Sequence, residues 1–253
     1  MAQFYVHESR SRHPAHVARR KKHLRTSWYT ILIILVASSV LVSLGFAEGI
    51  NWQSLSIALF QSIYRITLAY FIALVLGVSI ALLSGTGRVS DVLFPVFDVL
   101  QNIPSFALIP IFAYFLGYTD YMIIIFAATS IIWPILFAVM ASTRGAKEEL
   151  NDASYIFGAR GRKRIIHFLA PLSFPSIITG SIIGIAIGWE AVIGAEIIGN
   201  AGGFGAFIEN ATKFGITGEV YAGTTAILIL VFILNRLIWS PLLSQNKHHH
   251  AEG

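Results

Sequence analysis

The sequence contains no cysteine, which excludes both disulfide bonds and thiolate metal sites. Charged residues are also few, because Asp, Glu, Lys and Arg make up only 12% of the 253 residues, against about 25% in an average soluble domain. Hydrophobic residues make up 55% of the chain, too large a share to bury inside one soluble core. The lipid bilayer is therefore the expected solvent for most of this sequence.

Motifs for chemistry are missing as well. The sequence has no P-loop, no metal-ligand spacing such as HExxH and no serine nucleophile elbow. We therefore expect that the chain is not an enzyme, hydrolyses no ATP and binds no metal or cofactor of its own. Its basic segments lack interleaved aromatic residues, so no nucleic-acid partner is expected.

Six apolar segments are long enough to cross the bilayer, which takes about 20 helical residues. They are expected at 28–46, 59–83, 92–116, 121–140, 175–198 and 221–243. The third is interrupted by Pro95, Pro104 and Pro110, and its amphipathic first half is compatible with an interfacial start. The sequence thus predicts an all-α integral membrane protein with about six transmembrane helices.

The distribution of basic residues predicts the orientation. With the N-terminus inside, the inner loops and tails hold fifteen Lys and Arg residues and the outer loops hold one. Both termini are therefore expected in the cytoplasm. The expected organisation is a basic cytoplasmic tail over 1–27 that lies against anionic lipid, a transmembrane domain over 28–243 and a second cytoplasmic tail over 244–253.

The inner loop over 144–171 holds most of the polar residues of the second half of the chain. A short helix is predicted over 147–157, with its acidic residues early, where the helix dipole favours negative charge. Gly158 follows where a left-handed cap is expected. A second, basic helix is predicted over 162–169, and Pro175 is expected in the first turn of the next span. Such a loop is suited to contact a soluble partner.

The same loop carries a motif. Its residues Asp152-Ala153-Ser154, Gly158 and Phe168-Leu169-Ala170-Pro171 resemble the pattern E-A-A-x3-G-x9-I-x-L-P, with the Gly-to-Pro spacing kept. The pattern is that of permease subunits of binding-protein-dependent ABC importers. The resemblance implies that this loop is the coupling helix that docks into an ATPase subunit. The implied coupling residues are Glu148, Glu149, Asp152, Ala153, Ser154, Gly158, Arg160 and Pro171.

Other segments resemble the nitrate, sulfonate, taurine and bicarbonate branch of that family. They lie at 62–68, 101–110, 188–196 and 202–205. The resemblance implies a type I importer fold in a prokaryotic inner or plasma membrane and a small anion as substrate, with heterocyclic solutes such as pyrimidine precursors left open. It also implies four kinds of partner: ATPase subunits that hold ATP and Mg, a second permease copy as a homodimer, an extracytoplasmic binding protein and lipid.

Three charged residues fall inside predicted spans: Arg65, Glu190 and Glu196. A charge at the bilayer centre costs about 2.5–3.5 kcal/mol on insertion scales, so each is expected to face a cavity or a partner. They are candidate pathway or gate residues together with Pro104 and Trp189, and Arg65 is the most attractive lining group for an anion. The alternative is a buried ion pair. Glu190 and Glu196 are six residues apart and therefore cannot share one helix face.

Gly180, Gly184 and Gly188 recur every four residues on the fifth span. This spacing predicts close helix packing, either within the subunit or at a dimer seam. The outer loop over 199–220 is glycine-rich and contains a short amphipathic segment over 204–214, which we expect to close the pathway and meet a binding protein.

Two other functions are compatible with the composition. A stand-alone secondary transporter or channel would transport without an ATPase, but it leaves the spacing from Asp152 through Gly158 to Pro171 unexplained. A membrane scaffold would tolerate neutralisation of its intramembrane charges without a transport defect.

Overall fold

The structure, a computed structural model, describes residues 50–84, 87–145, 161–234 and 236–237. Within these ranges it is helical apart from short connections and contains no strand, which confirms the all-α prediction for this part of the chain. The expected first span and both tails lie outside the described residues.

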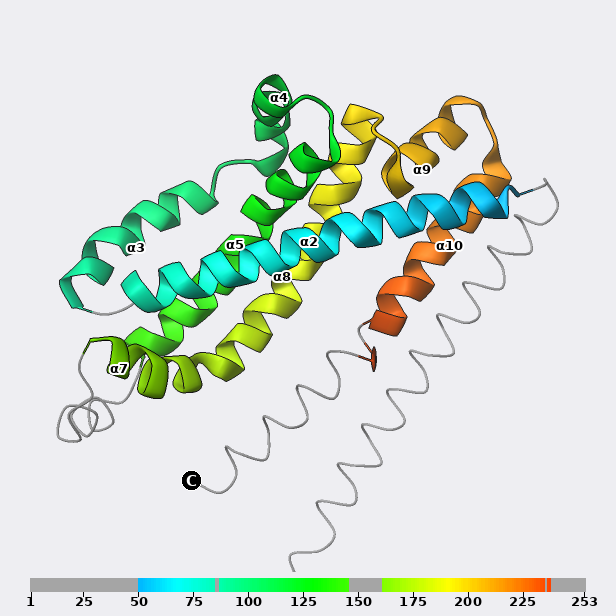
Figure 1. Ribbon diagram of the computed structural model, residues 1–253. Helices are drawn as coiled ribbons and strands as arrows, with labels where there is room; N and C mark the ends of the chain where they lie inside the picture. Colours follow the sequence, from blue (N-terminus) through cyan, green and yellow to red (C-terminus); the bar gives the residue numbers. More distant parts are fainter. Residues whose placement is uncertain (1–49, 85–86, 146–160, 235, 238–253) are drawn as a thin grey trace, which may run out of the picture.

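Among the described residues, four helices are long and apolar enough to cross a membrane. They are α2 (Trp52–Ser84), α5 (Asp120–Arg144), α8 (Ala170–Gly199) and α10 (Thr217–Leu234). Their positions confirm four of the expected spans, with the helices beginning between one and seven residues earlier than predicted. α5 and α8 pack side by side along their length, and α2 crosses both of them (Figure 1).

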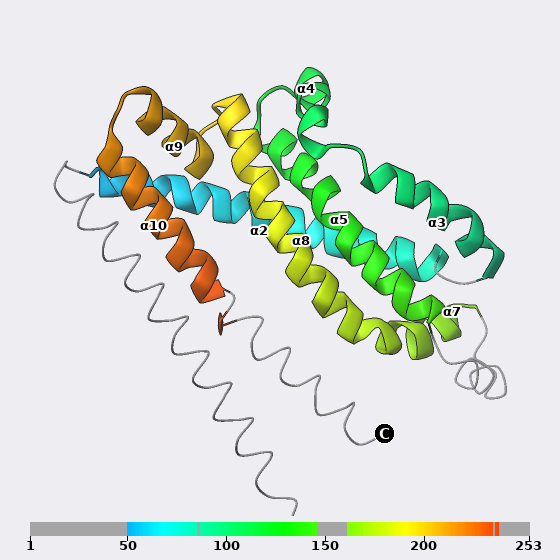
Figure 2. The same ribbon diagram turned by 180° about the vertical axis from the view of Figure 1, so that it is seen from behind.

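The expected third span is two helices, α3 (Gly87–Gln101) and α4 (Ser105–Leu116), bent by 89° at the break between them. Figure 2 shows both helices at one edge of the bundle, beside α5. Of the three prolines, only Pro104 stands at the break, where it is the N-cap of α4 and follows the non-helical Ile103. Pro95 and Pro110 lie inside helices.

The α8 helix begins differently from the prediction. α7 (Arg162–Arg164) continues through a π-helical turn at Ile165–Leu169 directly into α8, so no break separates the basic helix from the span. The Ala170 N–H donates to the Ile165 carbonyl in this wider turn, which accommodates Pro171 just after it. Pro175 is therefore inside the helix rather than in its first turn.

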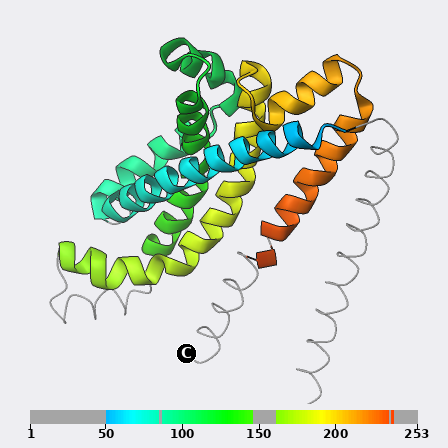
Figure 3. The same ribbon diagram turned by 45° about the vertical axis from the view of Figure 1, so that its right-hand side comes forward.

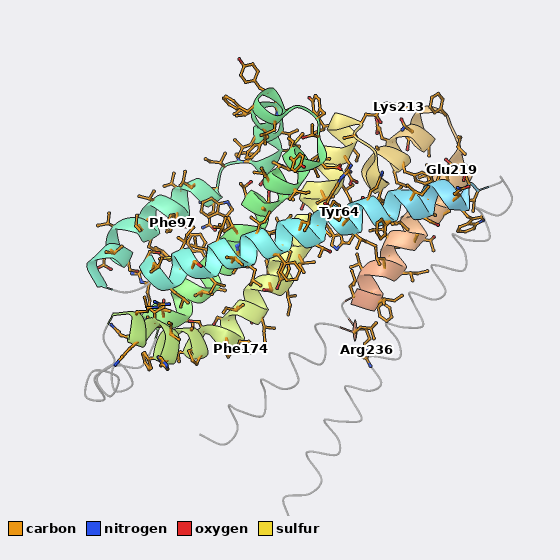
Figure 4. The ribbon with its side chains drawn as sticks, viewed as in Figure 1. Tyr64, Phe97, Phe174, Lys213, Glu219 and Arg236 are labelled. Atoms are coloured by element: carbon orange, nitrogen blue, oxygen red, sulfur yellow. The ribbon has the colours of Figure 1, made fainter. Side chains whose placement is uncertain are left out.

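The helix α9 (Gly203–Lys213) confirms the amphipathic segment expected near 204–214. It packs on α8 and on the N-terminal half of α2 (Figure 3). α4 and α9 lie at the same end of the bundle, the end predicted to face outside (Figure 1). Lys213 and Glu219 lie at that end and Arg236 lies past the far end of α10 (Figure 4).

The three glycines of the α8 stripe lie against α5. A Cβ atom on Gly180 would come within 2.8 Å of the Ile135 Cα and the Pro134 carbonyl oxygen. Beside Gly184 and Gly188 the nearest atoms belong to the side chain of Ile131. The stripe therefore lies at a helix contact within the subunit, where α5 and α8 approach closely.

Gly180→Ala is expected to lower the free energy of unfolding by about 1–3 kcal/mol, because the added methyl group meets backbone atoms that cannot rotate away. Gly184→Ala should lower it less, since the nearest atom there is a side-chain methyl 3.0 Å away. Melting temperatures in detergent would rank the two variants. The control is Ile183→Ala on the 50% exposed face of α8, and an equal loss in all three would contradict the packing argument.

Candidate functional site

A buried arginine joins three helices at the predicted outer end. Arg65 of α2 donates from Nε to Asp120 Oδ1 of α5 at 2.9 Å and from Nη2 to the same oxygen at 2.5 Å. Its Nη1 donates to Glu196 Oε1 of α8 at 2.7 Å. The side chain of Arg65 is only 3% exposed, so its charge depends on these carboxylates rather than on water.

The remaining donors of Arg65 bind the backbone that follows α8. Nη1 also donates to the Gly202 carbonyl at 3.0 Å, and Nη2 donates to the Ala201 carbonyl at 2.8 Å. A guanidinium has five N–H donors, and all five are used here. Arg65 therefore fixes the turn between α8 and α9 as well as the two carboxylates.

Glu196 is fully buried and caps the start of α9. Its carboxylate accepts from Ser62 Oγ at 2.8 Å and from the Gly205 N–H at 2.8 Å. Ser62 Oγ in turn accepts from the Phe204 N–H at 2.8 Å, and Gln61 Oε1 accepts from the Gly203 N–H at 2.8 Å. These amides are the first of α9 and have no partner inside the helix, so α2 and α8 supply acceptors that the helix itself lacks.

We call Ser62, Arg65, Asp120, Glu196 and the backbone of 201–205 the Arg65 network. It holds one cation and two carboxylates, and the two carboxylates differ in environment. The Asp120 side chain is 57% exposed and sits in the first turn of α5, whereas Glu196 has no exposed surface. Water therefore screens the Arg65–Asp120 pair, whereas the charges of Arg65 and Glu196 depend on each other, and removal of either would leave the other buried and unpaired.

The structure brings together two of the predicted pathway residues, but as a buried ion pair. Arg65 was expected to be the most attractive lining group for an anion. The structure contains the other arrangement left open by the sequence, a buried ion pair, in which all five N–H donors of Arg65 bind carboxylate or carbonyl oxygens. Glu196 likewise faces the protein interior and not an open pathway.

The other predicted pathway residues lie apart from this network. Trp189 is 7% exposed and belongs to the hydrophobic core between α2, α5 and α8. Pro104 is exposed at the bend between α3 and α4. Glu190 is exposed on α8, where no described residue pairs with it.

Of the predicted coupling residues, Pro171 alone lies within the described residues. It is exposed in the first turn of α8, at the end of the bundle opposite α9. The other seven lie in 146–160, outside the part of the chain that the structure describes.

Sequence reasoning missed Ser62 and Asp120 as parts of the network, and it also missed Gln61, which accepts from the Gly203 N–H. Ser62 lies three residues before Arg65 and so shares its helix face, which is a usable indication. Asp120 follows Thr119, whose hydroxyl accepts from the Met122 N–H as a helix N-cap. That pattern predicts the start of α5, but nothing in it indicates the distant arginine.

A cleft of about 400 Å³ with a mixed polar and apolar lining opens beside the network, between α2 and α9. Its lining includes the side chains of Ser54, Gln61, Asn200 and Asn210 and no charged residue. No group of His, Cys, Asp or Glu suited to a metal ion occurs among the described residues.

Long apolar helices tied together by a buried ion pair define a polytopic α-helical membrane protein. Residues 73–238 match the family described as binding-protein-dependent transport system inner membrane component, and the chain belongs to that family. It is thus a multi-pass protein of the cell membrane and a permease of the ABC importer class.

Three relatives illustrate the branch. The chain is 27% identical over 191 residues to the taurine transport system permease protein of Escherichia coli (strain K12), covering 75% of this chain and 68% of the relative. It is 27% identical over 194 residues to a nitrate import permease protein of Synechocystis, covering 76% and 70%. It is 26% identical over 196 residues to a bicarbonate transport system permease protein of Synechococcus elongatus, covering 77% and 69%. These three relatives are named for three different solutes, although their identities to this chain are nearly equal.

Proposed function

We propose that this chain forms the translocation pathway of an ATP-driven importer for a small solute with an anionic group. Taurine, nitrate, sulfonates and bicarbonate, which the relatives are named for, define the chemical class. The observation that carries the proposal is the family match over residues 73–238, a range that contains both the motif-bearing inner loop and Glu196 of the Arg65 network.

The importer would need three kinds of partner. Separate ATPase subunits, which hold ATP and Mg, would dock on the inner loop over 144–171, where the spacing from Gly158 to Pro171 supports a coupling role. A second copy of the chain would complete the pathway as a homodimer. A binding protein would deliver the solute at the end that carries α9, whose position is fixed by the Arg65 network.

Gly158→Arg is expected to abolish copurification of the ATPase from native membranes in mild detergent, because a long charged side chain replaces the motif glycine. The control is His167→Arg, which adds the same side chain at an exposed position of the same loop outside the motif's fixed residues. Mass spectrometry of the purified complexes would measure the ATPase per permease.

The wild type and the His167→Arg variant should both retain a stoichiometric ATPase. If the wild-type chain purifies without an ATPase and still transports the solute in liposomes, the chain is a secondary carrier and not an importer subunit. A chain that holds a soluble partner but transports no solute with it would establish a scaffold.

A further inference from the structure

One face of α8 is not covered by any other helix among the described residues. Thr179, Ile183, Ala186 and Glu190 are exposed and follow one another at spacings of four, three and four residues, so they form one stripe on the helix. The glycine stripe lies on another face, against α5. The exposed stripe is therefore the side of α8 that neither α2 nor α5 covers.

Glu190 is the unusual member of this stripe. It lies nine residues before the end of α8, about 13.5 Å along the helix, and within the span predicted over 175–198. The Thr179 hydroxyl donates to the Pro175 carbonyl within the helix, but the Glu190 carboxylate has no partner among the described residues. A carboxylate inside a membrane span is costly to expose to lipid, so we expect it to face water or a cation.

The described chain offers no cation to this carboxylate. α8 contains no Lys or Arg between Ala170 and Gly199. Arg65 has already used all five donors on Asp120, Glu196 and two carbonyl groups. Glu190 therefore differs from Glu196, whose charge is matched inside the subunit.

We propose that Glu190 lines the water-filled pathway and selects for a positive group on the solute, an inference that rests on the proposed function. A simple inorganic anion would be repelled by an unpaired carboxylate on its route, and in a homodimer by two. A zwitterion that carries a protonated amine beside its anionic group would be attracted through the amine. The solute class is thereby narrowed from small anions to amine-bearing anions, such as aminosulfonates.

The absence of native cysteine allows a direct test, because one introduced thiol is the only target for thiol reagents. Ala186→Cys places that thiol four residues before Glu190, about 6 Å along the same stripe. The full chain in liposomes would be treated at low salt with two methanethiosulfonates of similar size. One carries a trimethylammonium group, which stands for the protonated amine, and the other carries a sulfonate.

In Ala186→Cys the cationic reagent should react faster than the anionic one. Adding Glu190→Gln should lower the cation-to-anion rate ratio about tenfold, because a unit charge some 6 Å away in water acts on the two reagents in opposite directions. The matched control is Glu209→Gln in the same Ala186→Cys chain. Glu209 is paired with Lys213 on α9, so its removal should leave the ratio unchanged.

Two results would overturn the inference. A thiol at position 186 that reacts with neither reagent would show that the stripe does not face water. A rate ratio that Glu190→Gln leaves unchanged would show that Glu190 exerts no charge selection. The labelling needs neither an ATPase nor a binding protein, so it gives its answer even if the ATPase fails to copurify and the proposed function is wrong.

Discussion

Replacing Arg65 with leucine is expected to destabilise the fold by about 3–5 kcal/mol, the usual effect of removing one partner from a buried ion pair. The substitution would leave Glu196, which has no exposed surface, without its cation. It would also leave the carbonyl groups of Ala201 and Gly202 without their side-chain donor. Thermal unfolding in detergent and the yield of monodisperse protein would measure the loss.

Further variants distinguish the loss of the ion pair from other effects of Arg65→Leu. Asp120→Asn should change stability little, because the Asp120 side chain is 57% exposed and water screens its charge. The double variant Arg65→Leu, Glu196→Leu should lose less stability than the sum of the two single variants, since it leaves no buried charge unpaired. A melting temperature of Arg65→Leu equal to that of the wild type would contradict the structural role given to the network.

Hydropathy predicted the positions of α2, α5, α8 and α10 because crossing the bilayer requires an uninterrupted apolar helix. It could not predict where a proline breaks a helix. The chain bends at Pro104 and continues through Pro175, and the difference depends on whether neighbouring backbone groups find other partners. A π-helical turn also precedes Pro171 at the start of α8, and no sequence pattern indicated it.

The charged residues also show what the sequence alone could not predict. Counting charges inside spans found Arg65, Glu190 and Glu196, but the count could not separate a lining residue from a structural one. Arg65 and Glu196 are 131 residues apart in the chain, so their pairing depends on how α2 packs against α8. Glu190 and Glu196 belong to one helix and differ only in direction, and the six-residue spacing did predict that they could not face the same way.

Gly203→Ala is expected to be as damaging as the loss of Arg65, because this glycine lies inside the Arg65 network. Its Cβ atom would overlap Glu196 Oε1 and come within 2.6 Å of Arg65 Nη1. Its φ of 87° also lies in the left-handed region, which disfavours every residue with a Cβ atom. The methyl group would therefore push apart the ion pair and withdraw the Gly203 N–H from Gln61.

Gly215→Ala supplies the control for backbone strain alone. Gly215 has a φ of 69° and nothing within 4 Å of its Cβ position, so alanine there should cost only the left-handed penalty of about 1–2 kcal/mol. Both variants would be compared with the wild type by thermal unfolding in detergent. Both variants carry the same conformational penalty. If Gly203→Ala lowers the free energy of unfolding by several kcal/mol more than Gly215→Ala does, the difference is the cost of displacing the Arg65 network. Equal losses would mean that the turn after α8 can open without breaking the Arg65–Glu196 pair, and α9 would then be held mainly by its apolar contacts with α2 and α10.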